Sequence, residues 1–158
     1  MKVRDIMVNT PKYCRPDANL ASAVELMWVN DCGFLPVVDF DNRVTGVITD
    51  RDIAIALGTR NQRASDVLVR DVMTKRVYGC APDDDIHTAL QSMEKHQVRR
   101  LPVVNPDGKL AGILSIGDLT LHAEKKEGKK IPDLSSDEVV ETYQGIRVRQ
   151  LTEQVAQL

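Results

Sequence analysis

Two short stretches of the chain pair a hydroxyl residue with an aspartate three positions later. They are Thr49 with Asp52 and Ser115 with Asp118, and each pair directly follows a short apolar run. This pattern is typical of a buried strand that ends where a helix begins, with the hydroxyl as the helix cap. The first turn of a helix favours a phosphate or another anion, and an aspartate can accept hydrogen bonds from two neighbouring hydroxyls, such as those of a ribose. The two stretches therefore predict either plain helix caps or contacts to a ligand that carries phosphate or ribose.

These stretches belong to a longer internal repeat. A shift of 66 residues, which takes Asp52 to Asp118, aligns residues 3–52 with 69–118 without a gap. Sixteen of these 50 positions are identical, including Leu-Pro-Val-Val at 35–38 and 101–104. Such a match predicts two copies of one structural unit, related by a pseudo-twofold axis.

The hydrophobic pattern predicts the order β-α-β-β-α in each copy. In the first copy we expect a strand at 12–14, a helix at 20–30, a hairpin of strands at 34–39 and 43–49, and a helix at 50–57 that ends near Gly58. In the second copy the corresponding ranges are 77–80, 86–96, 101–104, 109–115 and 116–123. Gly46 and Gly112 are expected where another backbone approaches closely.

A further helix is predicted after the second copy. Residues 125–134 form a charged linker, and Ser135 with Glu138 forms a capping box that starts a helix over 135–158. Its apolar residues Leu151, Val155 and Leu158 need burial, either by folding back or on another subunit. The predicted domains are thus 1–66, 67–124, the linker and the tail helix.

Composition favours a compact soluble protein and disfavours nucleic-acid and membrane partners. The 158 residues are 42% hydrophobic and 28% charged, with a net charge of −2 and a pI near 5.9. Two half-size units would each be marginally stable alone, so we expect them to pack together. No apolar run reaches the roughly 20 residues of a membrane span, and the N-terminus lacks a signal-peptide core. We expect a cytoplasmic protein.

The cysteines and histidines show no pattern typical of a metal site. Cys14, Cys32 and Cys80 form no CxxC, which favours buried thiols over a regulatory disulfide in a cytosolic protein. Because Cys14 and Cys80 are equivalent in the repeat, a bridge between them stays open if the symmetry axis passes near them. The three histidines have no second ligand at metal spacing, so we expect solvated side chains.

Two tandem β-α-β-β-α units, each with Leu-Pro-Val-Val and Gly-x-x-Thr/Ser-x-x-Asp, resemble a pair of cystathionine-β-synthase-type (CBS) domains, the Bateman module. The resemblance covers residues 1 to about 123. It implies an α+β fold with two sheets packed face to face, two clefts between the repeats and a disc-shaped homodimer. It also implies an adenosine-type ligand such as AMP, ADP, ATP, S-adenosylmethionine or NAD(H), and sensing rather than catalysis.

The resemblance assigns one residue set to each cleft. Thr49 and Asp52 serve one cleft, with the ribose on the aspartate and the phosphates on the hydroxyl. In related modules, residues just before the Leu-Pro step approach the phosphates of a nucleotide whose ribose sits on the other repeat. Here these are Arg99 and Arg100, whose charge-assisted bonds to phosphate are each worth about 1.5 to 3 kcal/mol. We expect this cleft to prefer nucleotides with phosphates.

The second cleft is poorer in charge. It has Ser115 and Asp118, with Lys12 and the apolar Phe34 nearby, and is expected to hold a nucleoside-like ligand, to bind weakly or to stay empty.

The remaining candidate residues are Arg51 and Tyr78. Arg51 is a further candidate for phosphate, with pairing to Asp50 or solvent as the alternative. Tyr78 and Lys12 lie where family members hold the adenine ring.

Each of these residues also has a purely structural interpretation. Asp52 and Asp118 could act only as first-turn acids that favour the helix dipole, each worth about 0.3 to 1 kcal/mol. A single motif would favour that interpretation, whereas two copies in a recognisable pair favour ligand contact in at least one cleft. Arg99 and Arg100 could instead cover the surface or pair with acids across the interface.

The sequence shows no nucleophile with a base, metal cluster or paired acids, so we predict no enzyme activity and no required cofactor. We predict a stand-alone regulatory module that binds an adenine nucleotide as a regulatory ligand and signals in trans to an unidentified protein partner. The alternative is a ligand-independent dimeric scaffold whose tail helix docks a partner. A third class, nucleic-acid binding, requires a basic face that the composition does not favour.

Overall fold

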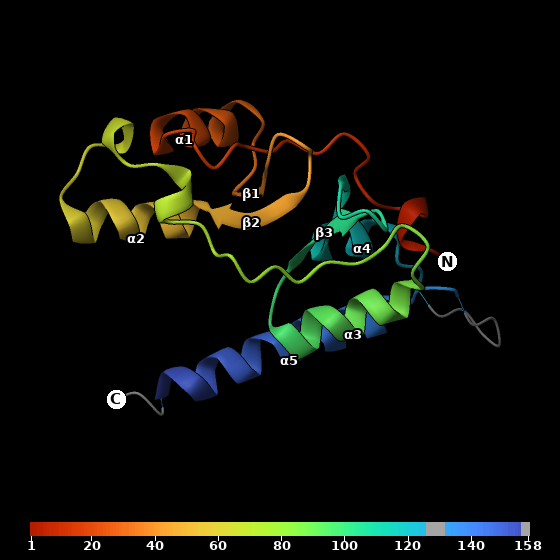
Figure 1. Cartoon of the computed structure of the whole chain (residues 1–158). Coiled ribbons are helices and arrows are strands. Elements are labelled where there is room, and N and C mark those ends of the chain that lie inside the picture. The colour runs from red at the N-terminus through yellow and green to blue at the C-terminus, as the bar shows by residue number, and fades with distance from the viewer. Residues whose placement is uncertain (126–131, 156–158) are drawn as a thin grey trace. The chain divides into compact units, whose positions relative to one another are not determined.

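The computed structural model of the chain describes residues 1–125 and 132–155, with side chains up to residue 148 (Figure 1). Both repeats contain a helix, two strands and a second helix in the same order. The first repeat contains α1 (Leu20–Val29), β1 (Phe34–Val38), β2 (Val44–Thr49) and α2 (Asp50–Arg60). The second contains α3 (Ile86–His96), β3 (Arg100–Val104), β4 (Leu110–Ser115) and α4 (Ile116–His122), and α5 (Ser136–Val155) follows. Short 3-10 turns lie at Val3–Asp5, Ala64–Asp66 and Val69–Asp71. The predicted α+β fold is confirmed.

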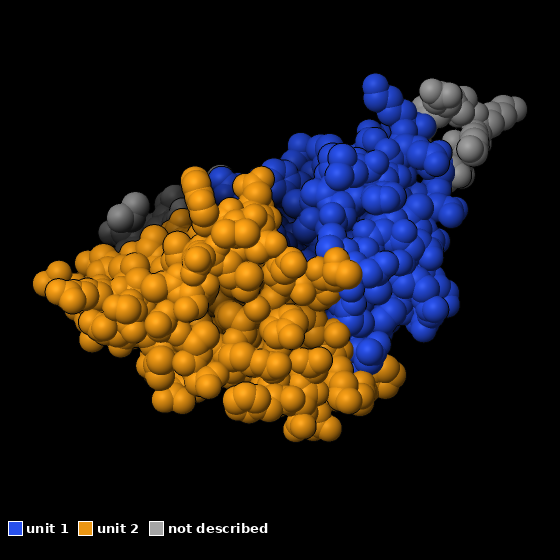
Figure 2. All heavy atoms as spheres, turned by 90° about the horizontal axis from the view of Figure 1, so that it is seen from above, with its two compact units in different colours: residues 1–9, 78–105, 111–158 blue, residues 10–77, 106–110 orange. Residues whose placement is uncertain are grey.

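The chain divides into two compact units that are coloured separately in Figure 2. Unit 1 consists of residues 1–9, 78–105 and 111–158, and unit 2 of residues 10–77 and 106–110. Each unit therefore combines most of one repeat with the lead segment of the other. In unit 1, for example, Val8 pairs with Ile113 of β4. In unit 2, Thr74 pairs in the same way with Val47 of β2.

Each repeat forms a two-stranded sheet beside its helices. Strands β1 and β2 are antiparallel, and Phe34 lies opposite Thr49, so the start of β1 adjoins the beginning of α2. All five residues of β1 are buried. The predicted first strands at 12–14 and 77–80 are each reduced to a single bridge residue. Cys14 forms an isolated parallel bridge with Val37, and Cys80 forms one with Val103. Pro16 and Pro82 follow closely, and a proline has no N–H to donate to a longer ladder.

The helix boundaries match the predicted ones at most ends. The turn at 16–19 offered Asp17 or Asn19 as the cap of α1, and Asn19 is the one that accepts a hydrogen bond from the Ser22 N–H. The expected end of α2 near Gly58 is wrong, since the helix continues to Arg60 and stops at Asn61 with φ 50°. A glycine costs a helix about 1 kcal/mol but does not end it, and asparagine tolerates the left-handed conformation of a C-terminal cap.

The tail helix α5 folds back onto its own chain and packs against α3 and α4 in unit 1. Its buried residues Val139 and Ile146 belong to the same core as Leu90 and Met93 of α3. The expected capping box is present, with Ser135 Oγ donating to Glu138 Oε2 at 2.5 Å. Most of the predicted linker and the side chains of Leu151, Val155 and Leu158 lie outside the described residues.

The expected close approach at the two strand glycines is confirmed. A Cβ on Gly46 would lie 2.8 Å from Met73 Sδ and 3.0 Å from the Thr74 carbonyl oxygen. A Cβ on Gly112 would lie 2.8 Å from the carbonyl oxygen of Val8. Only a glycine lets each lead segment pair so closely with its strand.

The cysteines are free thiols, as expected, and two of them are buried. Burial raises the pKa of Cys14 to about 11. Burial, followed by the negative charge of Asp84, raises the pKa of Cys80 to about 12. Both thiols therefore stay protonated and unreactive at neutral pH, whereas Cys32 is only half-buried.

Replacement of Gly46 by alanine is predicted to lower the free energy of unfolding by about 1 to 3 kcal/mol, since the added methyl overpacks against Met73 and Thr74. Gly58→Ala is the matched control, because nothing lies within 4 Å of its Cβ position. We expect that control to stabilise α2 by about 0.5 to 1 kcal/mol. Urea unfolding measures both changes, and equal effects of the two variants would contradict this packing.

Thiol labelling with an aromatic disulfide reagent at pH 8 is predicted to modify Cys32 rapidly and Cys14 and Cys80 slowly. The reason is that the thiolate reacts, and the raised pKa values of Cys14 and Cys80 keep both protonated. Cys32→Ser should remove the fast phase, and all three thiols should react after unfolding in guanidinium. Fast labelling of native Cys32→Ser would contradict the burial of the other two.

Candidate functional site

The two hydroxyl-aspartate pairs form reciprocal capping boxes at the starts of α2 and α4. The Thr49 backbone N–H and hydroxyl both donate to Asp52 Oδ2, at 2.9 and 2.7 Å. The Asp52 N–H donates back to Thr49 Oγ1 at 3.1 Å. In the second repeat the same three bonds join Ser115 and Asp118 at 2.8, 2.6 and 3.1 Å. The structural interpretation of these residues as helix caps is therefore confirmed.

Capping leaves part of each aspartate available. All bonds that the structure describes on the two carboxylates go to Oδ2, so Oδ1 of Asp52 and of Asp118 has no partner among the described residues. Both aspartates are half-buried. The hydroxyl hydrogens of Thr49 and Ser115, in contrast, are already donated to the carboxylates. The free acceptor of each pair is thus the aspartate, and a phosphate on either hydroxyl would have to displace an existing bond.

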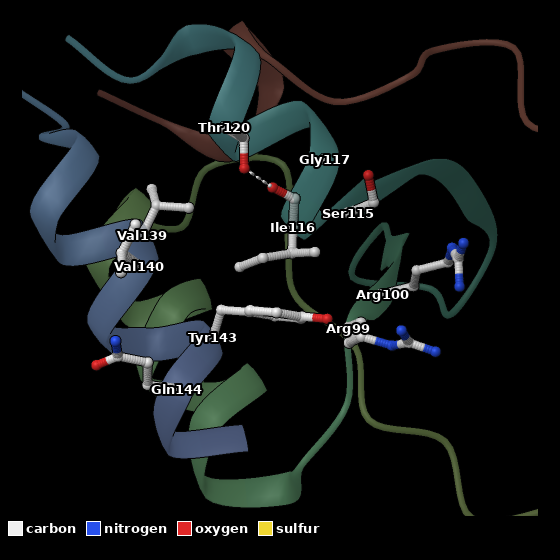
Figure 3. Close-up of a pocket in the computed structure, with 10 residues that line it drawn as sticks. All are labelled: Arg99, Arg100, Ser115, Ile116, Gly117, Thr120, Val139, Val140, Tyr143 and Gln144. Atoms are coloured by element: carbon white, nitrogen blue, oxygen red, sulfur yellow. Dashed lines mark hydrogen bonds between the residues drawn. The ribbon is translucent and has the colours of Figure 1, made fainter. Parts of the chain in front are cut away.

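Arg99 directly precedes β3 and Arg100 is its first residue, next to the beginning of α4. The Arg99 carbonyl accepts the Ile116 N–H at 2.9 Å, just as the Gly33 carbonyl accepts the Asp50 N–H at 3.2 Å in the first repeat. Both arginines line a cavity of about 530 Å³ in unit 1, together with Ser115 (Figure 3). Their expected partnership with Thr49 and Asp52, which belong to unit 2, remains a prediction.

Sequence reasoning missed most of this cavity. Its other walls come from α4 and from the side of α5 that faces it: Ile116, Gly117, Thr120, Val139, Val140, Tyr143 and Gln144. The capping box at Ser135 predicted that a helix starts there, but no sequence signal said which surface it would cover.

Tyr78 lies in unit 1 and stacks on His96. The two ring centroids are 3.8 Å apart and the ring planes differ by 11°. His96 was expected to be solvated, but it is half-buried and has this aromatic partner. One face of the Tyr78 ring is therefore covered, and its expected contact with an adenine ring remains a prediction.

Lys12 and Arg51 are exposed in unit 2. The Arg51 backbone N–H donates to Asp50 Oδ1 at 2.7 Å. Among the described residues, no ion pair joins the side chains of Arg51 and Asp50. The expected roles of both cations toward a ligand remain predictions.

No cluster of three or more histidine, cysteine or acidic side chains that could hold a metal ion occurs in the described part of the chain. Every helix among those residues is too short or too polar to cross a membrane.

Comparison with known proteins places the chain. Residues 3–59 and 69–124 each match the CBS domain family. An uncharacterized 17.7 kDa protein of Acidianus ambivalens is 38% identical over 118 residues, covering 75% of this chain and 70% of that protein. The CBS domain protein TA0289 of Thermoplasma acidophilum superposes with a TM-score of 0.75 at 24% identity, covering 93% of this chain and 76% of the other.

A second similar structure was solved with ligands bound. The CBS domain pair of protein MJ0100, solved in complex with 5′-methylthioadenosine and S-adenosyl-L-methionine, is 25% identical with a TM-score of 0.69. It covers 77% of this chain and 98% of its own. The duplicated match, the two repeats and their shared strand-to-helix junctions lead to one conclusion: the chain belongs to the CBS domain family, of which it carries two tandem copies.

Proposed function

We propose that the chain is a regulatory module that binds an adenosine-type ligand and signals in trans to a protein partner without catalysing a reaction. The observation that carries this proposal is the free carboxylate oxygen in both repeats. Asp52 and Asp118 are each fixed through Oδ2, and Oδ1 has no partner among the described residues.

A fixed carboxylate with one free oxygen suits a ribose. The 2′- and 3′-hydroxyls of a ribose are neighbouring donors, and an ionised carboxylate only accepts hydrogen bonds. Thr49 and Ser115 then act as positioning residues, because their hydroxyls hold the carboxylates in place. Because the carboxylate side chain is already ordered before binding, a ligand that contacts it causes little further loss of side-chain conformational entropy.

The relatives support an adenosine compound as the ligand class. The MJ0100 domain pair was solved with two adenosine derivatives, neither of which contains a phosphate group. Arg99 and Arg100 are the cations proposed to add a preference for phosphates, with Arg51 as a further one. Tyr78 and Lys12 are proposed to contact the adenine ring. The compounds to be tested therefore include adenosine derivatives with phosphate groups and adenosine derivatives without them.

A second candidate function is a ligand-independent dimeric interaction protein. Exposed apolar side chains on α1 favour it, since Trp28 is 85% and Val29 72% exposed. Such residues are typical of protein contact surfaces. The tail helix, which was the expected docking element of this alternative, packs against α3 and α4 instead.

Asp52→Asn and Asp118→Asn are predicted to weaken binding of AMP, ADP, S-adenosylmethionine or 5′-methylthioadenosine about tenfold or more at the affected cleft. Asparagine keeps an oxygen for the cap but loses the charge that strengthens the bonds to a ribose. Thermal unfolding with each compound gives the measurement, because a ligand that binds only the native state stabilises it by mass action.

Asp137→Asn is the matched control, as Asp137 is an exposed acid in the first turn of α5. It should leave the ligand-induced shift in melting temperature unchanged. If no compound of the panel shifts the melting temperature of the wild-type chain, the regulatory proposal fails and the interaction protein remains.

A further inference from the structure

The cavity in unit 1 has a counterpart at the equivalent place in unit 2. A cavity of about 470 Å³ lies between α1 and the start of α2, where Gly33 and Asp50 occupy the positions of Arg99 and Ile116. The two cavities are similar in size, and both fall in the range of roughly 300 to 1,000 Å³ that is typical of small-molecule sites. Their linings can therefore be compared position by position.

The two cavities carry opposite charge. Among the described residues, the cavity in unit 2 is lined by the acidic Asp31 and Asp50 and by no cation. In the same part of the chain, the cavity in unit 1 is lined by Arg99 and Arg100 and by no acidic side chain. Only the cavity in unit 1 favours a negatively charged occupant, and planar guanidinium groups bind carboxylate, sulfonate and phosphate oxygens through paired hydrogen bonds.

The tail helix gives the unit 1 cavity an apolar wall. Tyr143 and Val140 of α5 face Ile116 of α4, and the Tyr143 ring lies beside Ile116 with its hydroxyl end toward Arg99 (Figure 3). Tyr143 is 39% and Val140 54% exposed, so each presents a substantial apolar surface without full burial. A flat apolar body could stack on Tyr143 while its charged group reaches Arg99.

The position of α5 is fixed independently of any ligand. Its buried residues Val139 and Ile146 lie in the core of unit 1, and His87 Nε2 lies 3.4 Å from Glu138 Oε1. The wall of the cavity is thus built on a helix that the core holds in place, which is the condition for a precise site.

We propose that this cavity binds an aromatic organic anion between Arg99 and the α5 residues Val140 and Tyr143. The charged group of the ligand pairs with Arg99, and its ring packs on Tyr143 and Ile116. The proposal goes beyond the adenosine-type ligand, because it adds the α5 residues Val140 and Tyr143 to arginines that are also proposed to contact phosphates.

The test uses 8-anilinonaphthalene-1-sulfonate, an aromatic anion, and N-phenyl-1-naphthylamine, the same ring system without the sulfonate. The full chain should bind the sulfonate at one site per chain, measured by calorimetry and by fluorescence. Arg99→Gln should weaken the sulfonate at least about tenfold, because it removes charge-assisted bonds, and should change binding of the neutral amine much less.

Val140→Trp fills the cavity from α5 and should weaken binding of both compounds at least about tenfold. Glu141→Trp is the matched control, since Glu141 is exposed, adjoins Val140 and does not line the cavity. It should leave both affinities within about twofold of the wild type. Thermal unfolding without ligand verifies that each variant is folded.

The proposal is overturned if the sulfonate does not bind the wild-type chain at about 1 mM. It is also overturned if Arg99→Gln weakens the neutral amine as much as the sulfonate, or if Glu141→Trp acts like Val140→Trp. The adenosine proposal is tested separately, since Val140→Trp should leave the melting-temperature shift by S-adenosylmethionine unchanged, while Asp52→Asn should leave sulfonate binding unchanged.

Discussion

The reciprocal hydrogen bonding between a hydroxyl and an aspartate at each strand-to-helix junction is the interaction on which the rest of the structure depends. It satisfies backbone N–H groups that the first turn of a helix leaves without partners. In both repeats it also fixes the carboxylate through one oxygen and leaves the other without a partner in the described part of the chain. The same bonds therefore start the helix and order a potential ligand contact, so the structural and functional interpretations of Asp52 and Asp118 do not exclude each other.

Duplication places two equivalent strand-to-helix junctions in surroundings that have diverged. Leu90 of α3 is 4% exposed beneath the tail helix, whereas Val24, its equivalent on α1, is 42% exposed. Glu94 of α3 packs against Gly145 of α5, and its equivalent Trp28 is almost fully exposed. One repeat is thus completed by its own tail helix, while the equivalent surface of the other is left open for contacts.

Charge has diverged along with packing. The residue before the first strand of the hairpin is Gly33 in one repeat and Arg99 in the other, and the first helical residue is Asp50 in one and Ile116 in the other. These substitutions reverse the sign of the charge around two cavities of similar size. The repeats therefore share a scaffold but differ in the charged residues around their cavities.

The sequence predicted the features that depend on neighbours along the chain. The repeat, the hairpins, the caps at Asn19, Thr49 and Ser115 and the range of α3 follow from local spacing, and all are found in the structure. The end of α2 was misplaced because a single glycine is a weak signal against a helix that remains favourable up to Asn61.

Features that depend on distant partners were not predicted. Local spacing identifies which side of a helix is apolar but not what covers it, so the packing of α5 on α3 and the cavity beside Tyr143 could not be derived. The stacking of Tyr78 on His96 was not predicted for the same reason, since the two residues are 18 positions apart in the sequence and only the fold brings their rings together.

Native mass spectrometry of the full chain, incubated with an equimolar mixture of AMP, ADP, ATP, S-adenosylmethionine and 5′-methylthioadenosine, tests the central claim most directly. The account predicts a bound species whose added mass equals that of one of these compounds, and its loss in the variant that carries both Asp52→Asn and Asp118→Asn. A wild-type spectrum that shows only the unliganded mass, or an equally liganded double variant, would contradict it.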